Sequence, residues 1–149
     1  MPLKLSSKTQ YALLALIELA EKYASDEPVQ IQYLATQQDI PDRYLEQLLA
    51  TLKRDKLVRS YRGPRGGYLL AREPRTITLL EIVKAMEGDS SQISEGENGS
   101  HQNAGTVVQD VWQEACQAAN SVLESYTLYD LVEKWNTKRQ SHQSLMYYI

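Results

Sequence analysis

Two helical patterns separated by only three residues constrain the fold of this chain most. Residues 31–38 (IQYLATQQ) and 42–55 (DRYLEQLLATLKRD) each repeat apolar side chains at helical spacing. Only Asp39-Ile-Pro41 joins them, and a proline suits the first turn of a helix because its missing N–H has no helical partner there. Two helices joined by so short a turn predict a helix-turn-helix unit.

The neighbouring segments predict the elements that surround this unit. Ser6 and Ser7 are both candidate caps for a first helix that runs to about Tyr23. Two short apolar segments, residues 57–61 and 66–71, flank a loop rich in glycine and proline, which predicts a β-hairpin. A long helix, a helix-turn-helix and a basic hairpin in this order describe a winged helix-turn-helix domain, here residues 1–87.

The rest of the chain divides by composition and period. Thr78-Leu-Leu-Glu81 is a capping box that opens a fourth helix at the end of the first domain. Residues 88–106 are rich in Gly, Ser, Asn and Glu and are predicted to form a flexible polar loop. Residues 107–135 are predicted to form a dimerisation helix and a C-terminal helix. Residues 136–149 lack a clear apolar period and are predicted to form a loosely ordered tail. The predicted fold class is mostly α with a small β-hairpin wing: a winged helix-turn-helix domain plus a long dimerisation helix.

Small and apolar side chains recur at three- and four-residue spacing along the helix that follows the polar loop. Alanines in such a stripe allow two helices to approach closely. A helix of this kind beyond a compact domain needs a partner, and a second copy of the chain is the simplest one. The residues expected at this homodimer contact are Val108, Val111, Ala115, Ala118 and Val122.

Charge is distributed unevenly along the chain. The net charge is −3, yet residues 1–87 hold 13 basic and 11 acidic side chains, whereas residues 88–149 hold 3 and 8. Residues 53–75 hold 8 basic and only 2 acidic side chains. A local concentration of positive charge determines the field that a polyanion meets, so the cluster favours nucleic-acid binding. By itself, the cluster is equally consistent with a solvated charged surface.

The second helix of the pair has the polar face of a DNA-reading helix. Its leucines are expected to point inward, which leaves Arg43, Gln47 and Arg54 on the outer stripe. Arg can pair with guanine, Gln with adenine, and Glu can accept a hydrogen bond from cytosine. Any amphipathic surface helix displays polar residues, so this helix alone does not decide the function.

The basic hairpin beside that helix favours DNA binding. Its glycines allow a tight turn and a close approach to a surface, and its arginines project from a narrow loop that can enter a minor groove. The residues expected to contact DNA are Arg43, Tyr44, Glu46, Gln47, Arg54, Arg59, Arg62 and Arg65.

Several stretches closely resemble the Rrf2 family of bacterial transcription regulators, which includes IscR-like and CymR-like members. They are KLSSKTQYALLALIELA, IPDRYLEQLLATLKRDKLVRSYRGPRGGYLLA, ITLLEIVKAMEG and TLYDLVEKW. The resemblance covers about residues 3–135 and implies a winged-helix homodimer that binds operator DNA. It implies that Tyr44, Glu46 and Gln47 occupy the family's recognition-helix contacts and Arg62 its wing arginine. Arg43 stands where several members have a small polar residue, so a different base is expected there.

The cysteine content departs from that of the best-known members. Many of them carry three cysteines between the fourth helix and a following tryptophan, which hold an iron–sulfur cluster. This chain has one cysteine, Cys116, which follows Trp112 and is interpreted as a small packed side chain. Cluster ligands are thiolates or comparable donors, and His101 and His142 are isolated in the sequence. No metal site and no cofactor are therefore predicted.

These observations predict a homodimeric, sequence-specific transcriptional regulator, by default a repressor, that binds a near-palindromic double-stranded operator. We expect no enzymatic activity, because nucleophile–base pairs, metal-ligand spacing and phosphate-binding loops are missing. A signal peptide and a membrane span are not evident, so a cytoplasmic location is expected. The alternative is a protein-interaction adaptor that uses the winged fold without DNA, favoured if the acidic second half covers the basic surface. The operator, the regulated genes and any effector or partner protein cannot be read from the sequence.

Overall fold

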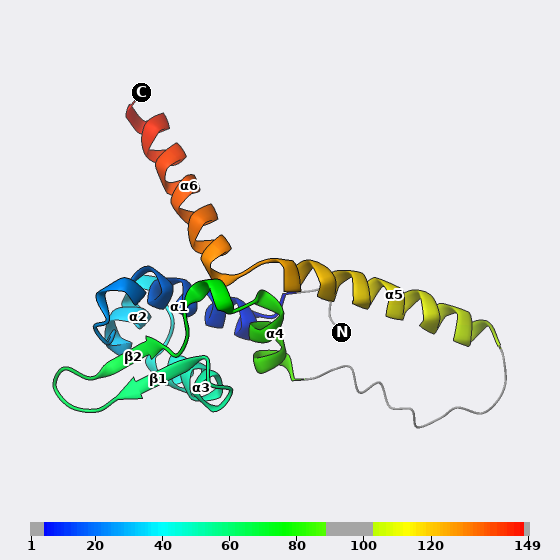
Figure 1. Ribbon diagram of the computed structural model, residues 1–149, viewed down its shortest axis with the longest axis horizontal. Helices are drawn as coiled ribbons and strands as arrows, with labels where there is room; N and C mark the ends of the chain where they lie inside the picture. Colours follow the sequence, from blue (N-terminus) through cyan, green and yellow to red (C-terminus); the bar gives the residue numbers. More distant parts are fainter. Residues whose placement is uncertain (1–4, 89–102, 148–149) are drawn as a thin grey trace.

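A computed structural model describes residues 5–88 and 103–147 of this chain (Figure 1). The fold is mostly helical, with one antiparallel hairpin and two long C-terminal helices. The elements are α1 (Ser7–Glu21), η1 (Tyr23–Ser25), α2 (Ile31–Gln38), α3 (Asp42–Arg54), β1 (Val58–Tyr61), β2 (Gly67–Leu70), η2 (Pro74–Thr76), α4 (Leu79–Glu87), α5 (Ala104–Ser125) and α6 (Leu128–Tyr147). Among the described residues, no helix is long and apolar enough to cross a membrane.

One apolar core holds α1–α4 and the hairpin together. Leucines on one face of α3 interlock with the buried face of α1 and with Ile82 of α4. Leu128 at the start of α6 is fully buried in the same core. Burying each such side chain contributes about 1.5–3 kcal/mol to folding. The four α3 leucines, all predicted to point inward, are Leu45, Leu48, Leu49 and Leu52.

Local sequence signals determine the ends of these helices. The Ser6 hydroxyl caps α1 by accepting a hydrogen bond from the Thr9 amide, as predicted. Asp39 adopts the left-handed conformation that ends α2, with φ of 52°. Thr78 and Glu81 form the predicted capping box of α4.

The hairpin pairs β1 with β2 in antiparallel register from Val58 opposite Leu70 to Tyr61 opposite Gly67. On the other side of β2, Tyr68 exchanges two backbone hydrogen bonds with Val29, which ties the hairpin to the segment before α2. The wing is therefore attached to the helix-turn-helix unit along one edge, and β1 forms the opposite edge of the hairpin.

The hairpin glycines serve the fold more than an external surface. A Cβ atom on Gly66 would collide with the carbonyl oxygen of Tyr61, and one on Gly67 would lie 2.5 Å from the carbonyl oxygen of Val29. Only Gly63, with φ of 106°, has open space where a side chain would stand. The fold itself therefore requires glycine at positions 66 and 67, because backbone atoms of Tyr61 and of Val29 occupy the space of a side chain. The close approach of this backbone to an outside surface stays a prediction.

The C-terminal helices are longer than predicted. Asn103 caps α5, so residues 104–106, assigned above to the polar loop, are helical; the remainder of that predicted loop from residue 89 to 102 lies outside the described residues. Helix α6 continues to Tyr147, so the prediction of a loosely ordered tail is wrong for residues 136–147. This segment contains no glycine or proline to end the helix, and Arg139 pairs with Glu21 of α1 at 3.1 Å.

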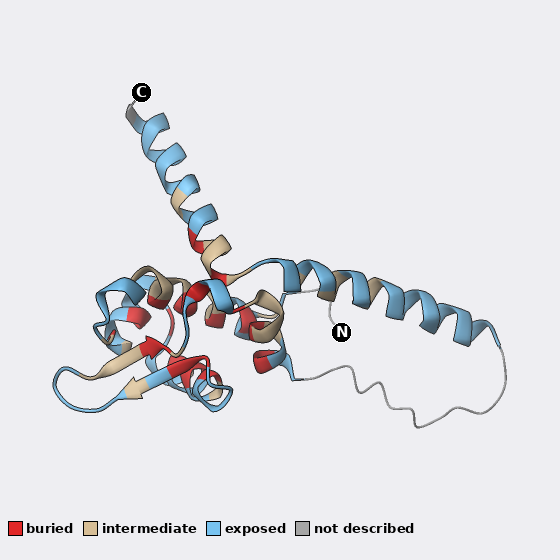
Figure 2. Ribbon diagram, viewed as in Figure 1, coloured by how far each residue is buried: buried red, intermediate tan, exposed pale blue. Residues whose placement is uncertain are grey.

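Helix α5 extends away from the domain core. It packs against α4, yet none of its residues is buried, and Figure 2 shows most of its length as exposed. A 22-residue helix with this much exposed apolar surface is unusual for a lone chain in water.

Glu87, the last residue of α4, is joined to the start of α1. Ser6 Oγ and Thr9 Oγ1 both donate hydrogen bonds to Glu87 Oε1, the latter at 2.6 Å. The hydrogen bonds from Ser6 and Thr9 hold the pKa of the Glu87 carboxyl below its ordinary value. The carboxylate therefore stabilises the packing of α4 against α1.

We expect Glu87→Gln to lower the free energy of unfolding at neutral pH by about 1 kcal/mol, because charge-assisted hydrogen bonds become neutral ones at an exposed site. The folded-state pKa is depressed, so this contribution is complete above the ordinary pKa of 4.5 and is lost as the pH falls through the lower folded-state value. Urea unfolding of parent and variant at neutral and acid pH measures it. A difference between the two proteins that does not shrink in acid contradicts this assignment.

Candidate nucleic-acid interface

The outer face of α3 carries the polar residues that the sequence predicted there. With the leucine face buried, Arg43, Glu46, Gln47 and Arg54 are all exposed. Arg54 lies 3.5 Å from Asp55, an ion pair that is open to solvent. These side chains form one accessible stripe along the helix, free to meet the edges of bases in a major groove.

Tyr44 differs from its neighbours on α3. It is half-buried, packs against the core, and its ring meets that of Tyr11 on α1 edge to face, with the centroids 5.7 Å apart. This contact fixes the first turn of α3 to α1. Tyr44 therefore has a packing role in addition to its predicted DNA contact.

The wing presents its arginines to solvent. Arg59 lies on β1, and Arg62 and Arg65 flank Pro64 in the loop, which a hydrogen bond from the Gly66 amide to the Gly63 carbonyl closes at 2.8 Å. All three arginines are exposed, and no carboxylate of the described residues lies within 4.0 Å of them. Their charges are available to an anionic partner.

A shallow basic groove of about 610 Å³ runs between the end of α3 and the base of the hairpin. Its floor includes Val58, Ser60 and Ala71. Its basic side chains are Lys53, Lys56, Arg59 and Arg72. The groove extends the positive surface from the recognition helix toward the wing.

Two members of the basic cluster have internal partners that the sequence did not reveal. Arg72 Nη2 lies 2.9 Å from Glu81 Oε2. The Arg75 guanidinium lies over the ring of Tyr129 on α6, 4.0 Å from its centroid. Residues 53–75 thus offer less free positive charge than their composition suggests, because tertiary contacts engage two of the eight cations.

The described part of the acidic second half does not cover the basic surface. In Figure 1, α3 and the hairpin lie together, whereas α5 and α6 project away from them. The adaptor alternative would be favoured if acidic helices covered the basic surface. Residues 103–147 do not cover it.

Four of the five predicted dimerisation residues lie on the exposed part of α5. Val108, Val111 and Val122 are 67%, 61% and 56% exposed, and Ala118 is also exposed. Ala115 is half-buried. The predicted stripe is therefore free of contacts within one chain over most of its length.

The half-buried face of α5 is a different one. Cys116, Ala119 and Leu123 follow each other at helical spacing, are half-buried, and lie in the half of α5 nearer the domain. Val107 and Trp112, 64% and 53% exposed, extend the exposed apolar face. Only packing against α4 distinguishes the two faces, because both are apolar in the sequence.

Comparison with known proteins adds sequence and structural relatives. The family model described as "Rrf2: Iron-dependent Transcriptional regulator" matches residues 5–134. The HTH-type transcriptional regulator CymR of Bacillus subtilis is 33% identical over 147 residues, which cover 99% of this chain and 100% of that protein.

Solved structures agree with the sequence matches. The structure of CymR, the global cysteine regulator of B. subtilis, has a TM-score of 0.74 and 35% identity, covering 89% of this chain and 98% of that one. T. potens IscR has a TM-score of 0.73 and 35% identity, covering 90% and 89%. These similarities confirm the predicted winged-helix fold class.

Proposed function

Since this chain belongs to the Rrf2 family of transcriptional regulators, we propose that it acts as a homodimer that binds a near-palindromic operator through α3 and the wing. Its family is one of regulators and not of enzymes. The observation that carries the proposal is the exposed polar stripe of α3 beside three wing arginines without carboxylate partners among the described residues.

In the proposed complex, α3 enters the major groove and the wing enters the adjacent minor groove. Arg43, Glu46 and Gln47 then face base edges, whereas Arg54 and Arg59 face the phosphate backbone. Arg62 and Arg65 reach the minor groove, where a narrow width strengthens the negative potential. Most of the affinity comes from phosphate neutralisation and most of the sequence preference from α3.

Pairing of α5 with its copy supplies the dimer. When two such helices cross, the exposed stripe of valines and alanines on each helix is buried against the same stripe on the other, and the small side chains permit close contact. Two recognition helices held in this way should lie about 34 Å apart, one turn of DNA. An operator with two inverted half-sites follows from the two-fold symmetry.

We propose that this regulator works without a cysteine-ligated iron–sulfur cluster. The family description names iron, but the sequence has a single cysteine, and such clusters take four ligands, mostly thiolates. Cys116 is half-buried on α5 and is the single thiol of each chain, so a dimer would hold two thiols and not the set that a cluster takes. The donor set does not fit the cluster, so operator binding is assigned to the protein alone, in the cytoplasm and with repression as the default output.

Selection of bound fragments from the source organism's genomic DNA tests the proposed function. The full chain should enrich fragments that share an inverted repeat with half-sites about one helical turn apart. Retention of fragments without a common sequence indicates non-specific binding only and contradicts the proposal.

Gln47→Ala should weaken binding to the selected operator by about 1–3 kcal/mol and should hardly change binding to random DNA, because a base contact is lost and phosphate contacts remain. Titration of both DNAs with parent and variant measures the two affinities. The matched control is Gln140→Ala, which changes an exposed residue of α6. Helix α6 projects away from α3 in Figure 1, so this variant should bind like the parent. Equal losses on operator and random DNA contradict a base-reading role for Gln47.

A further inference from the structure

We propose that Arg72 and Glu81 form a clasp that positions the wing, and that Arg72 is a positioning residue and not a phosphate contact. This inference rests on the proposed DNA-binding function. It concerns how the wing is held at the angle that DNA requires, in addition to its backbone pairing with Val29 and the packing of Val58 and Leu70 in the core.

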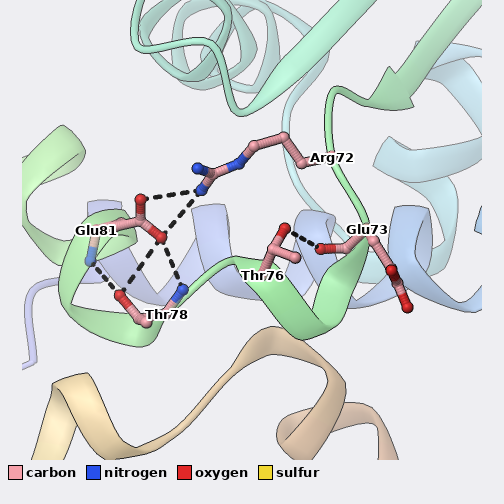
Figure 3. Close-up of polar contacts among 5 residues, drawn as sticks. All are labelled: Arg72, Glu73, Thr76, Thr78 and Glu81. Atoms are coloured by element: carbon pink, nitrogen blue, oxygen red, sulfur yellow. Dashed lines mark hydrogen bonds and ion pairs between the residues drawn. The ribbon is translucent and has the colours of Figure 1, made fainter.

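The clasp connects the end of the hairpin to α4. Arg72 lies two residues beyond β2, and its Nη2 donates to both carboxylate oxygens of Glu81 at 2.9 Å each (Figure 3). One guanidinium nitrogen is shared between the two carboxylate oxygens, and both side chains are 42% exposed, so this charge-assisted contact restrains the two side chains at a surface site. The chain leaving the wing is thereby attached to the first turn of α4.

Glu81 is itself held in place by the capping box. Its Oε2 accepts a hydrogen bond from the Thr78 amide at 2.9 Å, and its own amide donates to Thr78 Oγ1 at 3.2 Å. Partial burial raises the pKa of Glu81, but the hydrogen bonds from Thr78 and Arg72 outweigh it, and the pKa lies below its ordinary value. Arg72 therefore pairs with a carboxylate that is ionised and fixed to the backbone.

The first turn of α4 is in turn fixed to the link between α5 and α6. The Leu79 amide donates to the Tyr126 carbonyl at 2.9 Å, and the Leu128 amide donates to the Ile77 carbonyl at 2.8 Å. Through Arg72, the wing is connected to the junction from which α5 projects. In the proposed dimer, this connection sets the orientation of each wing relative to the two-fold axis.

The location of Arg72 offers a competing role. It lines the same basic groove as Lys53, Lys56 and Arg59, and charge alone makes it a candidate phosphate contact. The two roles predict opposite effects of Glu81→Gln. If Arg72 binds phosphate, removal of the competing carboxylate should strengthen DNA binding; if the clasp positions the wing, the same change should weaken it.

Operator affinity of the full chain as a function of salt separates the two roles. With the clasp, Arg72→Ala and Glu81→Gln should each weaken binding by about fivefold, with the salt dependence unchanged. The double variant should be no weaker than either single variant, because each change breaks the same contact. Glutamine also serves in a capping box, so Glu81→Gln leaves α4 capped.

Hydrogen exchange of the wing gives a readout that does not need DNA. Amides of residues 58–70 should exchange faster in both variants, whereas amides of α1 should not change. Glu73→Gln is the control for charge, because it removes one negative charge from the segment that also holds Arg72. Glu73 itself makes only a long ion pair, 4.0 Å from Arg75. This variant should leave both exchange and affinity at the parent's level or slightly strengthen binding.

Three results overturn the clasp: tighter binding by Glu81→Gln, a salt slope that falls by about 1 in Arg72→Ala, or unchanged exchange of the wing in both variants. Failure of the proposed function is a separate result, since it is seen in the parent as an absence of operator binding, and the exchange measurement then still tests the clasp.

Discussion

Val111→Glu combined with Val122→Glu should split the dimer and weaken operator binding by about 100-fold or more. Both valines are more than half exposed in the single chain, so the change should not unfold the winged domain. Across a two-fold axis, however, the four introduced carboxylates would meet within an apolar contact. Each monomer then binds its half-site alone and loses the effective concentration that a linked second site provides.

Sedimentation and DNA titration of this double variant are the measurements. The matched control is Gln113→Glu combined with Gln117→Glu, which adds the same charge to exposed positions on the opposite side of α5. The control should remain dimeric and bind like the parent. A Val111/Val122 variant that stays dimeric, or a monomer with undiminished affinity, shows that α5 is not the dimer contact.

Arg62→Ala combined with Arg65→Ala should remove most of the wing's contribution to binding. Each arginine that displaces a counterion from the DNA, in the minor groove as well as at a phosphate, adds about 0.9 to the slope of log affinity against log salt concentration, so the slope should fall by about 1.8. Loss of two charged contacts should lower affinity by about 10- to 100-fold at low salt and by less at high salt.

The control for net charge is Lys134→Ala combined with Lys138→Ala. It removes two positive charges from α6, which projects away from α3 and the hairpin in Figure 1. Its salt slope should equal that of the parent. If both double variants lose affinity to the same degree, net charge and not the wing determines binding.

The helix-turn-helix unit could be predicted from the sequence nearly to the residue. The helices α2 and α3 were predicted at residues 31–38 and 42–55 and are observed at Ile31–Gln38 and Asp42–Arg54. Helical period, caps and turns depend on side chains a few residues apart, so they can be read locally. The exposed stripe of α3 follows directly, because inward leucines leave only one face for polar residues.

The C-terminal helix was the clearest failure of local reasoning. Residues 136–147 have no apolar period, yet α6 runs through them from a start that is buried in the core at Leu128. A segment without helix breakers continues a helix that tertiary contacts have already nucleated, since extension costs far less than nucleation. The start of α6 follows from a local cap formed by Thr127 and Asp130, whereas only the packing of Leu128 and the pairing of Arg139 with Glu21 show how tertiary contacts support the helix.

Properties that depend on neighbouring residues could be read from the amino-acid sequence: the order of the elements, the caps, the leucine face of α3 and the lack of a thiolate set for a cluster. The partners of residues far apart in the chain could be seen only in the folded molecule. Gly67 lies against the backbone of Val29, Arg72 pairs with Glu81, and Arg75 covers Tyr129. Composition specifies which charged and apolar side chains are present. Packing alone determines which of them pair or are buried within the molecule and which remain exposed to DNA or to a second chain.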